Sequence, residues 1–410
     1  MNSIKINQII PRLIIFSIYL IPLIGLIDFL ISIGALPGIP SRGRVDHPFP
    51  IMIVGKELLI LIMLMLLVVI AFNKLKIQAI SVIILMVVGF LILYSSSLIV
   101  MVSGLRESLC FVYIIAGKLF SDQSRVNLKY GKVKLVKAIK IVLLIELFFV
   151  LLQTQLMPPV ESFTFLGSRP VGSFTNPNTI GVFGCLSILL LILFKEKKEK
   201  ISVLYFICAI LLAFLSGSRV AITLIMLILV INQLTVMKPS LLKLMTAFLG
   251  LLMLVIIITN INYISNKPLG LSIIEGDRVS NIINYLTTTD LFHLLFGYGW
   301  GAHTSWYYIL SSINSPSIGL DSLYASMLAQ IGLIGSVFFG IFMCWLFNLG
   351  GKKGRYLLVV FAIIGIQINV FEYYPANLLI FLALGIFISE NKDLNNTRKI
   401  QTVTYLSVRK

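Results

Sequence analysis

Residues 319–348 read GLDSLYASMLAQIGLIGSVFFGIFMCWLFN, with one acidic residue near the start and no basic residue. A helix needs about 20 mostly apolar residues to cross the hydrocarbon core of a bilayer. This run is longer than that minimum. It therefore predicts a transmembrane helix.

The rest of the chain shares this apolar character. Of its 410 residues, 58% are hydrophobic and 12% are charged, and the mean hydropathy is +1.02. No soluble globular domain has this balance, so lipid is the expected solvent for most of the surface. The net charge of +17 comes from basic residues clustered between apolar runs, a pattern typical of membrane topology rather than of nucleic-acid binding.

Twelve apolar runs are predicted as transmembrane helices: 11–33, 51–72, 77–95, 98–118, 135–156, 177–194, 201–216, 218–236, 241–260, 319–348, 356–371 and 374–389. The run 98–118 is the weakest because it contains Arg106 and Glu107. No internal repeat stands out, so we expect one integral membrane domain over residues 1–410. The first run is too long for a signal peptide and lacks a small-residue cleavage site, which predicts a retained span.

Lysine and arginine are divided unevenly between the predicted loops. With the N-terminus in the cytoplasm, alternating spans place 25 of the 33 Lys and Arg residues on the inner side. Short cytoplasmic loops carry such an excess. The sequence therefore predicts a multi-pass protein with both termini in the cytoplasm.

Residues 261–318 form a long segment of mixed polarity that alternation places outside as one large loop. Four of its apolar residues have the i, i+3, i+4, i+7 spacing of one helix face: Val279, Ile282, Ile283 and Leu286. This spacing predicts an amphipathic helix on the membrane surface. Asp277 and Asp290 are candidate N-caps for this helix and for a second short one. The turn Gly-Tyr-Gly-Trp-Gly at 297–301 lacks the GK[ST] ending of a nucleotide-binding loop.

Of the eight basic residues outside the inner segments, four arginines are predicted at or near the outer membrane boundary: Arg106, Arg169, Arg219 and Arg278. The planar arginine fork matches phosphate oxygens with two hydrogen bonds. Together, these arginines would make a site for an anionic headgroup. Taken singly, each is equally well explained by snorkelling or by pairing with a local acid.

Two short motifs carry the arginines Arg169 and Arg219. In GSRPVGSFTNPNTIG at 167–181, Asn176 is suited to cap the next helix and Pro177 to its first position. Helix N-termini also attract anions, so Arg169, Asn176 and Asn178 are candidate ligands of one phosphate. The turn Ser-Gly-Ser-Arg at 216–219 puts Arg219 at the start of a helix, where a cation opposes the helix dipole and an anionic ligand would offset the cost.

Three titratable residues are candidates for acid–base chemistry. Asp321 begins the run 319–348, where it serves either as a helix cap or as a general base. His303 is the rival base or a plain loop histidine. Glu146 lies within a predicted span and is either functional or part of a structural pair. The three histidines are far apart and the four cysteines lie in apolar runs, so neither a metal site nor a disulfide framework is expected.

Four segments, in this order, resemble the O-antigen polymerase and O-antigen ligase superfamily: RPVGSFTNPN at 169–178, SGSR at 216–219, GDR at 276–278 with the glycine-rich turn at 297–301, and DSLY with GLIG within 321–335. The ordered set is more specific than any one motif. Ligases often carry His-Asn where this chain has Asp321–Ser322, which favours the polymerase.

The resemblance implies an all-α, GT-C-like polytopic glycosyltransferase of the bacterial inner membrane that uses no metal and no nucleotide sugar or other cofactor. It implies that Arg219 and Arg278 hold the pyrophosphate of an undecaprenyl-linked oligosaccharide, with Arg169 close by. The expected partners are this lipid-linked oligosaccharide, the bilayer and a chain-length regulator, with no nucleic acid.

The function so implied is polymerisation of repeat units at the periplasmic face, as in lipopolysaccharide or capsule synthesis. One alternative is an O-antigen ligase that transfers glycan to lipid A-core. A second alternative is a transporter or a lipid-linked glycan flippase, which Glu146 favours. The repeated halves typical of transporters are not evident.

Overall fold

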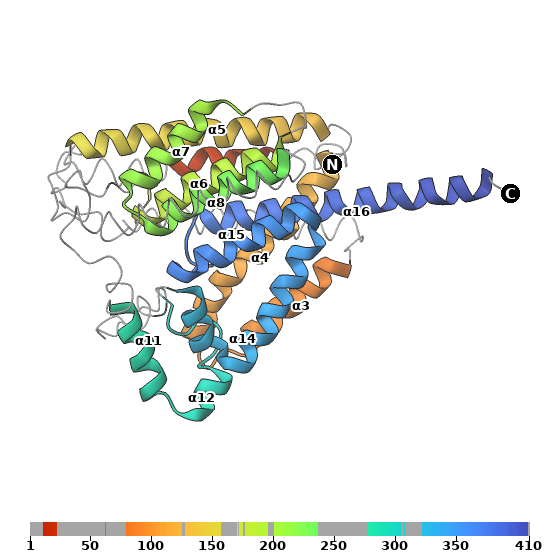
Figure 1. The fold of residues 1–410 in the computed structure, drawn as a ribbon. Helices are drawn as coiled ribbons and strands as arrows, with labels where there is room; N and C mark the ends of the chain where they lie inside the picture. The colour runs from red at the N-terminus through yellow and green to blue at the C-terminus, as the bar shows by residue number, and fades with distance from the viewer. Residues whose placement is uncertain are drawn as a thin grey trace.

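The computed structural model is all-helical over the residues that it describes, which are 11–22, 62, 79–124, 128–156, 170, 172–174, 177–195, 201–236, 277–304, 307 and 322–408. The helices, after a short one at Pro11–Pro22, are α3 (Ala79–Leu93), α4 (Leu98–Ser124), α5 (Leu128–Leu156), α6 (Pro177–Phe194), α7 (Val203–Leu215), α8 (Arg219–Val236), α11 (Asp277–Thr288), α12 (Leu291–Phe296), α14 (Leu323–Leu349), α15 (Gly351–Gln367) and α16 (Ala376–Val408). Helices α5 to α8 pack side by side in one layer, and α4, α14, α15 and α16 form a second group (Figure 1).

The predicted spans that fall within these ranges all contain a helix. The span 241–260, and all but one residue of 51–72, lie outside the described residues. By length and composition, two of the described helices can cross a bilayer, Leu98–Asp122 and Leu323–Leu349. Large apolar side chains are exposed along α3 and α14, including Phe90 at 68% and Phe338 at 70%. Lipid is a natural solvent for such surfaces, because soluble proteins rarely expose large apolar patches.

The bounds of several helices differ from the prediction. α4 extends past 118 to Ser124. It passes through Arg106 and Glu107 as predicted, and the Glu107 carboxylate is buried against an amide donor of Asn369 rather than exposed to lipid. α15 ends at Gln367, short of 371, where the Asn369 side chain accepts from the Phe371 amide and turns the chain. α16 runs to Val408, well beyond the predicted end at 389. The polar residues after 389 end the apolar run but still favour a helix.

α4 and α16 pack backbone to backbone. A Cβ on Gly117 would lie 2.1 Å from the carbonyl oxygen of Leu382, and one on Gly385 would lie 2.0 Å from that of Ile114. Small residues allow this approach between helices in membranes, where close packing replaces the hydrophobic effect. The pair therefore forms the centre of the second helix group.

The glycine-rich turn at 297–301 is inserted between α4 and a break in α14. Gly332, with φ 66° and ψ −176°, interrupts α14 and frees helix carbonyls. The Tyr298 amide donates to the Ala329 carbonyl at 2.9 Å, and the Gly299 amide donates to the Gln330 carbonyl at 2.8 Å. The turn thereby satisfies two acceptors that the helix break would leave unpaired.

Trp300 fixes the other side of this turn. Its indole is fully buried, and its Nε1–H donates to the Gly104 carbonyl at 2.8 Å and to Ser108 Oγ at 2.9 Å. The α3–α4 connection adds hydrogen bonds from Ser95 Oγ and Ser96 Oγ to the carbonyls of Trp300 and Tyr298. The glycine-rich turn is thus part of the packed core.

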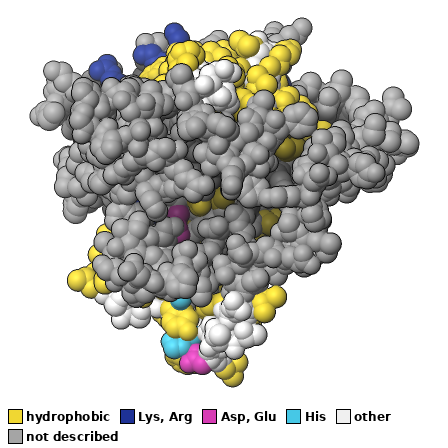
Figure 2. All heavy atoms as spheres, turned by 90° about the vertical axis from the view of Figure 1, so that its left-hand side faces the viewer, with side chains coloured by type: hydrophobic (Ala, Val, Ile, Leu, Met, Phe, Trp, Pro, Cys, Tyr) yellow, Lys and Arg dark blue, Asp and Glu magenta, His cyan; other side chains and the backbone are white. Residues whose placement is uncertain are grey.

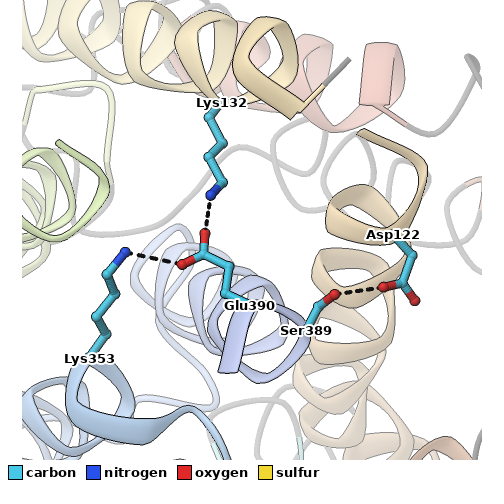
Figure 3. A network of polar contacts seen from close by, with 5 residues as sticks. All are labelled: Asp122, Lys132, Lys353, Ser389 and Glu390. Carbon is cyan, nitrogen blue, oxygen red and sulfur yellow. Dashed lines mark hydrogen bonds and ion pairs between the residues drawn. The ribbon is translucent and has the colours of Figure 1, made fainter. Parts of the chain in front are cut away.

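The opposite end of the molecule holds a charged network (Figure 3). The Glu390 carboxylate on α16 pairs with Lys132 of α5 and, at 3.1 Å, with Lys353 of α15, while Ser389 donates to Asp122 of α4 at 2.6 Å. Among the described residues, the parts of α4, α5, α15 and α16 predicted near the cytoplasmic side therefore meet at this end. The α3–α4 connection and the glycine-rich turn, both predicted as outer, meet away from it.

Candidate functional site

The segment at 170–174, part of the first motif, is held against α5 by two buried polar side chains. The Gln153 amide pairs with both backbone groups of Gly172, accepting from N–H at 2.8 Å and donating to C=O at 2.7 Å. The Glu146 carboxylate accepts from the Ser173 amide at 2.9 Å and from the Ser173 hydroxyl. Glu146 therefore makes a structural pair with the motif itself, which accounts for the Gly-Ser dipeptide.

The second motif forms the predicted tight turn between α7 and α8. Gly217 has φ 61°, Ser216 Oγ accepts from the Ser218 amide at 3.2 Å, and Ser218 Oγ accepts from the Ala221 amide at 3.4 Å. Ser218 is thus suited to cap α8, and Arg219 opens the helix as predicted.

This turn lies beside the first turns of α6. A Cβ on Gly181 would lie 2.4 Å from Ser216 Oγ and 2.8 Å from Ala221 Cβ. α6 begins at Pro177 as predicted, and Asn178 in its first turn is 7% exposed. The structure therefore brings the backbone of Arg219 close to the helix start that carries Asn178.

α11 and α12 fall where the outer loop predicted amphipathic helices. Arg278 lies in the first turn of α11, and Asp277 is its first residue rather than the residue before it. Asp290 caps α12 as predicted, accepting from the His293 amide at 2.9 Å, and this bond is the main cause that lowers the pKa of Asp290. The Asp290 carboxylate also contacts His293 Nδ1 at 2.6 Å.

The apolar face of α11 is divided between protein and the exterior. Tyr285 is buried against Ala325 and Ala329 of α14, whereas Ile283 and Leu286 are exposed. Exposed apolar residues continue along α12, and Figure 2 shows hydrophobic side chains around the histidine and acid at this tip. Both helices thus present apolar surface, as a helix on a membrane surface does.

His303 follows the glycine-rich turn in an unusual backbone conformation. Its φ of 56° lies in the left-handed region, which few residues other than glycine adopt. The ring contacts Tyr285 and Tyr298 edge-on, with centroid distances of 6.0 and 5.1 Å. Burial lowers the pKa of its imidazole, so the ring is neutral at pH 7 and able to accept a proton.

A buried polar layer lies next to the same turn. Asn369 Nδ2, in the α15–α16 connection, donates to Glu107 Oε1 of α4 at 2.8 Å and to Glu372 Oε1 at 3.0 Å. It also contacts Ser326 Oγ of α14 at 3.1 Å. Gln330 links this layer to the glycine-rich turn, because its amide donates to Ser326 Oγ and accepts from the Gly301 amide, both at 2.8 Å.

The sequence analysis did not identify this layer as a site. A signal was present, since Ser103 and Glu107, like Ser326 and Gln330, stand four residues apart inside apolar runs. Such pairs share one face of a helix, and polar groups within a span have buried partners or a function.

Other predicted site residues are placed only in part. Arg106 lies about two turns after the start of α4, inside the predicted span, and interacts electrostatically with the Glu107 carboxylate. The side chains of Arg219 and Arg278 lie outside what the structure describes, and so do Arg169, Asn176 and Asp321 entirely. Within the described part of the chain, no three His, Cys, Asp or Glu side chains form a group able to hold a metal ion.

Comparisons with protein-family models, with curated proteins and with solved structures found no match for this chain.

Proposed function

We propose that this protein is a multi-pass membrane glycosyltransferase that polymerises oligosaccharide repeats carried on undecaprenyl pyrophosphate. The proposal includes twelve spans in a bacterial inner membrane, cytoplasmic termini and a reaction at the outer face. It draws on the motif resemblance, and its support from the structure is the placement of the motif segments.

The observation that carries the proposal is this common placement. The motif segment at 170–174, the turn at 216–219 and the turn at 297–301 are far apart in sequence. Each lies toward the end of the bundle opposite the Glu390–Lys132–Lys353 network, with the segment at 170–174 set below that end beside Glu146. Two of the candidate arginines belong to backbone at this end, Arg219 at the start of α8 and Arg278 at the start of α11.

This arrangement suits transfer from a pyrophosphate leaving group. Negative charge grows on the pyrophosphate oxygens as the glycosidic bond to the carrier breaks. Fixed guanidinium groups at a low-dielectric boundary stabilise that charge more strongly than they would in water. Helix starts such as those of α6 and α8 add favourable backbone dipoles.

The topology gives one expected result. A reporter fused within 262–317 should be external, and reporters fused near Lys198 and Lys353 should be cytoplasmic, because of the 25-to-8 division of basic residues. Paired alkaline phosphatase and fluorescent-protein fusions measure this directly. A cytoplasmic signal from the long loop would reverse the orientation and remove the proposed site from the outer face.

Deletion of the gene tests the function itself. We expect surface glycan of the deletion strain to stop at one repeat unit, with normal length restored by the full chain in trans. Gel banding of the extracted polysaccharide separates the alternatives. Loss of every repeat from the core would indicate a ligase, whereas intact long polymer would refute a polymerase.

A further inference from the structure

The α15–α16 connection lies deep in the molecule. Glu390 and Lys132 form an ion pair, so α16 and α5 share one level at the inner end (Figure 3). From that level α5 continues 24 residues to Leu156, about 36 Å at 1.5 Å per residue. α16 extends only 14 residues back to Ala376, about 21 Å. Measured along the two helices, the start of α16 thus lies about 15 Å short of the far end of α5. Figure 1 shows both helices.

Glu146 of α5 lies at about the same depth as the α15–α16 connection, but in the other group of helices. It lies 14 residues beyond Lys132 on α5, which is again about 21 Å, and it holds Ser173 of the non-helical segment 170–174. A hydrocarbon core is about 30 Å thick. Non-helical backbone at such depth is tolerated only where protein buries it or where it faces water. Two polar, non-helical segments therefore form a recessed layer beneath the outer surface.

Glu372 is the accessible acid of this layer. Glu107 and Glu146 are 1% and 0% exposed, whereas Glu372 is only partly buried. A base must reach the proton that it removes, so exposure favours Glu372 over the two buried acids among the described residues.

Two buried polar atoms without a hydrogen-bond partner lie close to the Asn369–Glu107 contact and are a second observation at this site. Glu107 Oε2 and Ser103 Oγ are buried and have no hydrogen-bond partner within the described part of the chain. They lie one turn apart on α4 and therefore on the same helix face. Leaving a buried polar atom unpaired costs about 1–3 kcal/mol, so groups of this kind concentrate where chemistry or binding uses them.

We propose that Glu372 is the general base of the transfer reaction and that Glu107 and Asn369 position its carboxylate. This inference rests on the proposed function. The Asn369 amide, which donates to both carboxylates, ties the connection to α4 and fixes the direction of Glu372. Gln330 and Ser326 connect these residues to the glycine-rich turn through hydrogen bonds.

The step balances without a further reactant. The hydroxyl oxygen of the acceptor sugar bonds to the anomeric carbon of the donor sugar. The bond from that carbon to the pyrophosphate oxygen breaks, and its electron pair leaves with the polyprenyl pyrophosphate. The hydroxyl proton passes to a Glu372 carboxylate oxygen and then to water once the product has left.

The test is steady-state kinetics of the full chain in proteoliposomes, with the undecaprenyl-pyrophosphate-linked repeat as the only substrate. Glu372→Gln keeps the oxygen that accepts from Asn369 but removes the base. We expect kcat to fall by about 10²–10⁴-fold, the usual contribution of a general base, with KM little changed. Glu372→Asp, which keeps the carboxylate, should recover part of kcat. Asp290→Asn, which preserves the α12 cap at an exposed acid, is the matched control and should behave like the wild type.

Three outcomes separate the possibilities. Normal kcat in Glu372→Gln, or an increase of KM alone, would overturn the assignment while wild-type turnover still supported the proposed function. A large loss in Asp321→Asn or His303→Gln, with Glu372→Gln active, would move the base to that residue. If Glu372→Gln does not accumulate in membranes, Glu372→Asp decides, because a base role requires a lower kcat at unchanged KM and thermal stability. No turnover by the wild type would refute the proposed function itself.

Discussion

Alanine at Arg278 or at Arg219 should abolish polymer formation, and lysine should restore little of it. Both residues stand at helix starts, at the end of the molecule where the proposal places the pyrophosphate. Loss of one donor to a developing oxyanion reduces kcat by about 10²–10³-fold, or roughly 3–4 kcal/mol of transition-state stabilisation. Lysine keeps the charge but loses the planar, bidentate contact to phosphate oxygens.

The measurement is polysaccharide banding at matched protein levels in the membrane. Arg355→Ala is the matched control, because this exposed arginine of α15 bonds to Asn348 of α14 at 3.1 Å, near the Glu390–Lys132–Lys353 network and away from the proposed site. It should leave polymer length unchanged. Full-length polymer from Arg278→Ala would remove that residue from the site.

Alanine at Gly301 should destabilise the protein by about 3–5 kcal/mol, the range seen when a large buried side chain loses its place. Gly301 has φ 100°, and a Cβ there would lie 2.2 Å from the amide nitrogen of Gly104 and 2.3 Å from the carbonyl oxygen of Val100. Those neighbours are backbone atoms of α4, which cannot turn aside as a side chain can. The turn must therefore shift, and the buried hydrogen bonds of Trp300 would be lost with it.

Thermal unfolding of the detergent-solubilised protein measures this effect. Gly340→Ala in α14 is the control, because a Cβ there has no neighbour within 4 Å and alanine favours a helix. Its stability should equal or slightly exceed that of the wild type. Equal midpoints for the two variants would show that the glycine-rich turn does not support the bundle.

Features that depend on neighbouring residues could be predicted from the sequence. The start of α6 at Pro177, the turn at 216–219 and the Asp290 cap of α12 are confirmed in the structure. Each depends on interactions within one helical turn. The apolar runs likewise predicted where the helices lie. They did not predict that α15 ends at Gln367 or that α16 continues to Val408.

The identity of polar partners could not be predicted in the same way. Glu146 was a candidate for function or for a structural pair, and its partner is Ser173, 27 residues away in a non-helical segment. Arg106 was expected to pair with a local acid or to bind an anion, and it interacts electrostatically with the Glu107 carboxylate next to it in α4. The functions of Arg169, Asn176 and Asp321 stay predictions, because these residues lie outside the described ranges.

The sequence by itself determined an apolar, all-helical chain, the positions of its helices and the local turns between them, because these follow from hydropathy and short-range hydrogen bonding. Only the tertiary structure decided that Glu107 meets Asn369, 262 residues away, and that Trp300 bonds to Gly104, 196 residues away. No periodicity encodes such pairs. They arise because buried polar groups must find partners wherever packing brings helices together, and this requirement placed Glu372 in a recessed layer that local patterns did not reveal.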